Sequence, residues 1–122
     1  VLAVVLFGSL VQNSRGEGDI DLLIVTPHED FDPLMVSVEM LRKFGVAVDI
    51  VHVTLREFLA WLYDKPPILF GVLSGFELLF DRGYIRDFLE LLEREVVKEW
   101  VYVKEDKLWV RRELLPLMLK HA

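Results

Sequence analysis

Two carboxylates separated by one residue mark the part of the sequence best suited to chemistry. Asp19 and Asp21 open an apolar run that predicts a strand over residues 19–25. Residues two apart on a strand point to the same face and lie roughly 6.5–7 Å apart along the backbone. Both side chains could then reach a pair of divalent cations held about 3.5–4 Å apart. The spacing therefore predicts a metal site at Asp19 and Asp21.

A Gly-Ser turn precedes this strand in the chain. Gly8 and Ser9 follow an apolar segment, residues 4–7, that predicts another strand, and a polar loop over residues 12–18 leads on to Asp19. Such a turn offers backbone N–H groups and a hydroxyl to a phosphate. Metal ions and a triphosphate would lie side by side, which indicates a site that handles nucleotides.

Asp49 is a third candidate ligand. It interrupts residues 46–53, a run in which odd and even positions are both apolar, so we expect a strand buried on both faces. An unpaired carboxylate there would be strongly destabilising, and metal coordination would relieve that cost. If this strand lies beside residues 19–25, Asp49 joins Asp19 and Asp21. The alternative is a strand-end Asp that pairs with Arg42 or Arg56, or that is simply solvated.

Cap and breaker residues define the elements that must position these side chains. Asp32-Pro33 predicts the start of a helix that ends at Gly45, and Thr54 with Glu57 fits a capping box that opens a second helix through Tyr63. Further elements are expected as a short helix over 68–73, a strand over 76–80 and a long amphipathic helix over 85–96. This alternation predicts an α/β (α+β) fold with a mixed sheet. We expect the helices mainly on one face, with the other face partly open for the site.

The C-terminal part has two interpretations. Residues 100–103 and 108–110 read as a hairpin with a four-residue loop, whereas one continuous helix is the competing interpretation. We expect one domain over residues 1–122, with a core over 1–83 and a helix-and-hairpin extension over 84–122.

Composition limits the classes of partner and compartment. The 122 residues contain no cysteine, which excludes disulfides and thiolate zinc sites and favours the cytoplasm. The net charge of −6 is unfavourable for strong nucleic-acid binding. Residues 66–76 form an uncharged stretch that is too short to span a bilayer, so no membrane segment is expected.

The order of strand, Gly-Ser turn, Asp-x-Asp, helix and strand with a third Asp resembles the DNA polymerase beta-type nucleotidyltransferase superfamily. Residues 4–83 look most like its minimal nucleotidyltransferases. The resemblance implies that Gly8 and Ser9 hold the nucleotide phosphates, and that Asp19 and Asp21 bind two Mg²⁺ ions. It also implies that Asp49 completes the catalytic metal site and helps to deprotonate the attacking hydroxyl. Family members commonly have Arg-Ala-Arg-Gly after Gly-Ser, where this chain has residues 10–13 (LVQN). We therefore expect Arg15 to supply the phosphate contact.

The same resemblance implies an activity and a partner. The activity is the transfer of a nucleoside monophosphate, AMP from ATP or another NTP, to a hydroxyl acceptor. The acceptor could be a small hydroxyl compound or a protein side chain, and the resemblance favours a tyrosine of a HEPN-type toxin partner, which gives the chain an antitoxin role. A homodimer is the other expected assembly. The alternative function is a weak or inactive nucleotidyltransferase-fold protein that acts as a binding module.

Overall fold

Four strands form a mixed sheet in the order β3-β2-β1-β4. The computed structural model describes residues 1–8, 11 and 20–120. The strands are β1 (Ala3–Phe7), β2 (Ile20–Thr26), β3 (Val48–Thr54) and β4 (Phe76–Asp81). β1 is antiparallel to both β2 and β4, whereas β2 and β3 are parallel. The predicted mixed sheet of an α+β fold is confirmed.

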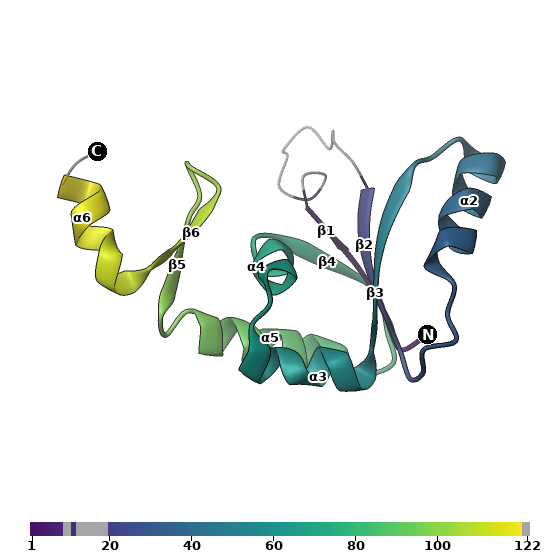
Figure 1. The fold of residues 1–122 in the computed structure, drawn as a ribbon, viewed down its shortest axis with the longest axis horizontal. Coiled ribbons are helices and arrows are strands. Elements are labelled where there is room, and N and C mark those ends of the chain that lie inside the picture. The colour runs from purple at the N-terminus through teal and green to yellow at the C-terminus, as the bar shows by residue number, and fades with distance from the viewer. Residues whose placement is uncertain (9–10, 12–19, 121–122) are drawn as a thin grey trace.

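Three helices cover one face of this sheet and a fourth lies on the other side. α3 (Leu55–Asp64), α4 (Pro67–Leu73) and α5 (Ile85–Val96) supply buried residues to the core, together with alternate residues of β1 and β2. α2 (Pro33–Phe44) contributes no buried residue and lies across the sheet from α4 (Figure 1). The expectation that helices pack mainly on one face is therefore correct for α3, α4 and α5, while α2 lies on the face that we expected to be open.

The predicted helix caps are present and explain where α2 and α3 begin. The Asp32 carboxylate accepts a hydrogen bond from the Met35 N–H at 3.1 Å. Thr54 and Glu57 form the capping box, with each side chain accepting a hydrogen bond from the other residue's backbone N–H. These hydrogen bonds from Thr54 lower the pKa of the Glu57 carboxyl.

The C-terminal segment is a hairpin, so the competing continuous helix is wrong. β5 (Trp100–Val103) pairs antiparallel with β6 (Leu108–Arg111). A short 3₁₀ turn, Arg112–Leu114, and α6 (Leu115–Lys120) follow. In Figure 1 this hairpin lies beyond α4, at the opposite end of the molecule from α2.

Among the helices of the described residues, none is both long and apolar enough to cross a bilayer.

Candidate functional site

Asp21 and Asp49 lie side by side at one end of the sheet. The parallel pairing of β2 with β3 places Asp21 directly beside Asp49. Laterally adjacent residues in a sheet point to the same face, and neighbouring strands are about 4.8 Å apart. Asp21 also lies opposite Phe7, the last residue of β1. The predicted neighbourhood of these two carboxylates is therefore confirmed.

The turn at Gly8 is in direct contact with the Asp21 side chain. Gly8 has a φ of +84°, a left-handed conformation that favours glycine. A Cβ added to Gly8 would collide with Asp21 Oδ2 and would lie 3.2 Å from Asp21 Cγ. The absence of a side chain at Gly8 thus leaves the space that the Asp21 carboxylate occupies. One carboxylate of the pair is held against the turn that was predicted to bind phosphate.

Asp21 and Asp49 lie on the face of the sheet that α3, α4 and α5 cover. The prediction that the site lies on the open face is therefore wrong. Strand alternation places Asp21 on the same face as Leu23 and Val25, both fully buried in the core. Asp21 is half-buried and Asp49 is exposed. The pair therefore lies at the rim of the core, where the buried residues of β2 end.

The burial argument for Asp49 is also wrong. β3 is an edge strand of the sheet rather than a central one, and Asp49 is exposed to solvent. Because the Asp49 carboxylate is solvated, it does not have the burial cost that we expected a bound metal to relieve. Arg42, one of the two predicted alternative partners, instead pairs with Glu39 at 2.6 Å. The case for Asp49 as a ligand now depends on its place beside Asp21.

Three predicted site residues, Ser9, Arg15 and Asp19, lie outside the described residues. Within residues 1–8, 11 and 20–120, no three acidic or histidine side chains gather as a metal-binding set. The third carboxylate of the predicted cluster is Asp19, so its role remains a prediction.

The chemistry of the described residues is suited to binding a divalent cation. Like charges directly across from each other on neighbouring strands destabilise a sheet, and a cation between them reverses that effect. Carboxylate oxygens are the ligands that Mg²⁺ prefers. Asp21 and Asp49 supply such oxygens from two neighbouring strands, and the Asp21 carboxylate lies against the Gly8 turn.

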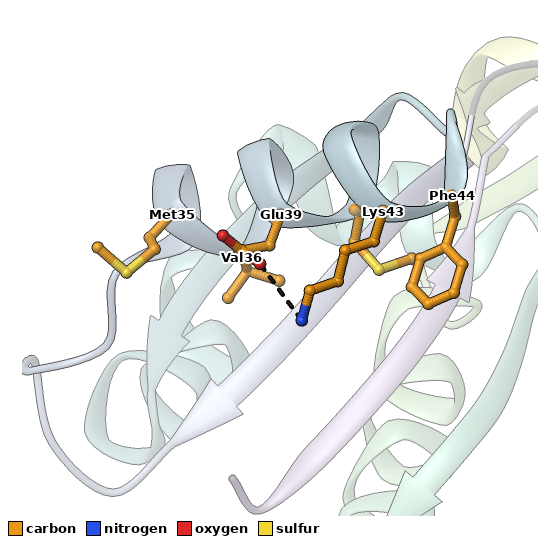
Figure 2. A pocket seen from close by; sticks show the side chains of 6 residues that line it. Met35, Val36, Glu39, Lys43 and Phe44 are labelled. Carbon is orange, nitrogen blue, oxygen red and sulfur yellow. Dashed lines mark ion pairs between the residues drawn. The ribbon is translucent and has the colours of Figure 1, made fainter.

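A separate groove under α2 does not have the features of a nucleotide site. Figure 2 shows its lining side chains projecting from one side of the helix. The groove has a volume of about 380 Å³, and its polar part is the ion pair between Lys43 and Glu39, with 3.4 Å between Nζ and Oε2. The other lining residues are Met35, Val36, Met40 and Phe44. This apolar lining is suited to protein side chains rather than to phosphate.

Comparison with known proteins gives structural neighbours at low similarity. No family model matches the sequence, and no curated protein matches it. One similar solved structure is a mutant of the toxin–antitoxin MntA-HpeT, with 18% identity and a TM-score of 0.49, covering 80% of this chain and 72% of that chain. A toxin–antitoxin solved with AMP-PNP has 17% identity and a TM-score of 0.49, covering 80% and 73%. A second MntA-HpeT mutant has 16% identity and a TM-score of 0.48, covering 80% and 72%. At these values we infer the function from the residues of the chain itself.

Proposed function

We propose that this chain is a nucleotidyltransferase that transfers AMP from ATP to a hydroxyl acceptor with the help of Mg²⁺. The observation that carries the proposal is the contact of the Asp21 carboxylate with the Gly8 turn, beside Asp49. Backbone N–H groups of such a turn are suited to phosphate oxygens, and adjacent carboxylates are suited to divalent cations. Asp19 would be the third ligand, and Ser9 and Arg15 would contact phosphate.

Each residue of the proposed site would have a defined part in the reaction. Asp21, Asp49 and Asp19 would hold Mg²⁺, which supplies Lewis-acid stabilisation of the phosphate charge when bound. The backbone of the Gly8 turn would contact the phosphate chain. The acceptor oxygen forms a bond to the α-phosphorus, the bond from that phosphorus to the bridging oxygen breaks, and pyrophosphate leaves. The exposed Asp49 carboxylate accepts the proton of the attacking hydroxyl and passes it to water.

A protein acceptor is supported by the apolar surface of the chain. α2 exposes large side chains that a lone domain would be expected to bury, among them Leu34 at 72% and Phe44 at 68%. The α6 segment likewise exposes Leu119 at 70%. We propose that these surfaces contact a protein partner and that the acceptor is a tyrosine of a HEPN-type toxin.

Label transfer tests the activity. The protein is incubated with ATP labelled at the α-phosphate, Mg²⁺ and a co-purified HEPN-type protein, and transfer of label to protein is measured. We expect transfer by the unchanged chain, and none by Asp21→Asn or Asp49→Asn. Asp64→Asn changes an exposed carboxylate at the end of α3 and is the matched control, with transfer retained. Equal transfer by Asp21→Asn and the unchanged chain would contradict the proposal.

The second candidate function is a binding module without catalysis, and the exposed apolar residues of α2 favour it equally. In that case no label is transferred, while Asp21→Asn still binds and inhibits the partner. Leu34→Glu on the exposed side of α2 distinguishes the surface from the site, because it should weaken partner binding without changing the affinity for nucleotide.

A further inference from the structure

The hairpin β5–β6 is fixed against α4 by specific contacts. Trp109 Nε1 donates hydrogen bonds to the Phe70 carbonyl oxygen at 2.9 Å and to Ser74 Oγ at 2.8 Å. The Phe70 ring contacts the rings of Trp100 and Trp109, with centroid distances of 5.0 and 5.7 Å. The hairpin turn therefore has a defined position relative to the end of α4 and the start of β4.

That position is close to the candidate site. Ser74 comes two residues before Phe76, which pairs with Phe7, the residue before Gly8. Ser74 therefore belongs to the short connection between α4 and the end of β4 that lies beside the end of β1. Figure 1 shows the turn of the hairpin on the same side of the molecule as the end of β1 and the start of β2. The hairpin, packed on α4, thus forms a wall at the side of the molecule where β1 ends and β2 begins.

A small basic pocket lies at this wall. It has a volume of about 150 Å³ and is lined by Ser74, Tyr102, Lys104 and Lys107. The hairpin turn contains four charged residues. Lys104 and Lys107 line the pocket, whereas Glu105 and Asp106 between them do not. The Lys107 N–H donates to the Lys104 carbonyl oxygen at 3.3 Å, which holds the ends of the turn together.

The candidate site has little positive charge of its own. Between Gly8 and Asp21 the sequence contains one cation, Arg15, and three acidic residues, Glu17, Asp19 and Asp21. Cations beyond Arg15 and the proposed Mg²⁺ would strengthen the binding of a triphosphate here. Lysine is a compact cation that binds phosphate oxygens as a point charge, and its flexible stem allows reach across a cleft.

We propose that Lys104 and Lys107 bind the phosphate chain of the nucleotide substrate. This inference rests on the proposed function and adds to it a binding surface contributed by the C-terminal extension. Ser74 Oγ donates to the Phe70 carbonyl oxygen at 2.7 Å and accepts from Trp109, so it shapes the wall while the two lysines supply the charge.

Calorimetric titration with a non-hydrolysable ATP analogue and Mg²⁺ tests the assignment. We expect Lys104→Gln/Lys107→Gln to bind the analogue roughly ten-fold more weakly than the unchanged chain, or worse. The variant should also bind inorganic triphosphate more weakly than the unchanged chain does, whereas its affinity for adenosine should be unchanged. The affinity of the unchanged chain should also fall more steeply with salt than that of the variant.

Two control variants make the result specific. Lys43→Gln/Lys98→Gln removes the same charge from exposed positions on α2 and near α5 and should bind normally. Lys104→Arg/Lys107→Arg keeps the charge and should restore most of the affinity. If the unchanged chain binds the analogue and the double Gln variant binds it equally well, the lysine assignment is wrong and the proposed function stands. If the unchanged chain binds no nucleotide, both are wrong.

Discussion

Substitution of Gly8 by alanine should damage the site and the fold by two separable effects. The first is backbone strain, because a φ of +84° costs a non-glycine residue roughly 1–2 kcal/mol. The second is steric, because the new Cβ would collide with Asp21 Oδ2 and must displace that carboxylate. In a domain of this size, each kcal/mol lowers the melting temperature by about 3–6 °C.

Gly45 offers a matched control for the strain alone. It has a φ of +66° at the end of α2, and a Cβ added there would meet nothing within 4 Å. Gly45→Ala should therefore lower the stability by a similar strain term and leave divalent-cation and nucleotide affinity unchanged. Gly8→Ala should lower the stability by at least as much and also lose most of that affinity.

Denaturant melts and calorimetric titration of Mg²⁺ with a non-hydrolysable ATP analogue measure the two effects for both variants. If Gly8→Ala binds cation and nucleotide as tightly as Gly45→Ala does, the contact between Gly8 and Asp21 has no role in ligand binding. Our interpretation of the turn would then be refuted.

Two further substitutions test the elements around the site. Burial raises the pKa of Asp81, but backbone N–H groups at the start of α5 outweigh it and lower the pKa below the ordinary 3.8. The unfolded chain therefore binds this proton first, and the contribution of Asp81 to stability is complete above about pH 4 and is lost as the pH falls further. Asp81→Ala should cost about 1 kcal/mol in a melt at pH 7, and equal stability of the two proteins there would contradict this role. Trp109→Phe removes the hydrogen bonds to Phe70 and Ser74, and should cost about 1–3 kcal/mol. It should also increase amide exchange in the hairpin, and unchanged exchange would mean that these bonds do not fix it.

Local signals in the sequence were sufficient for most of the elements. Asp32, Gly45 and the pair Thr54–Glu57 act through neighbours within a few residues, so their types alone define where α2 and α3 begin or end. The same holds for the hairpin, because two short apolar strands flank a charged four-residue loop.

The position of each strand in the sheet depends on contacts that are distant in sequence, and the prediction that the strand of Asp49 is buried on both faces failed for that reason. The apolar run around Asp49 suggests a central strand, but β3 is at the edge and Asp49 is exposed. No local pattern in the sequence indicates that Asp21 lies on the face of the sheet that α3, α4 and α5 cover. The basic pocket was missed for the same reason, because the packing of Trp109 on α4 brings Lys104 and Lys107 together with Ser74.

The number of divalent cations bound with nucleotide tests the central claim most directly. Electron paramagnetic resonance of Mn²⁺, titrated with a non-hydrolysable ATP analogue present, measures that number for the unchanged chain, Asp21→Asn and Asp49→Asn. Our account predicts that the unchanged chain binds Mn²⁺ together with the analogue and that each variant loses bound metal. Equal binding of Mn²⁺ by all three proteins would contradict it.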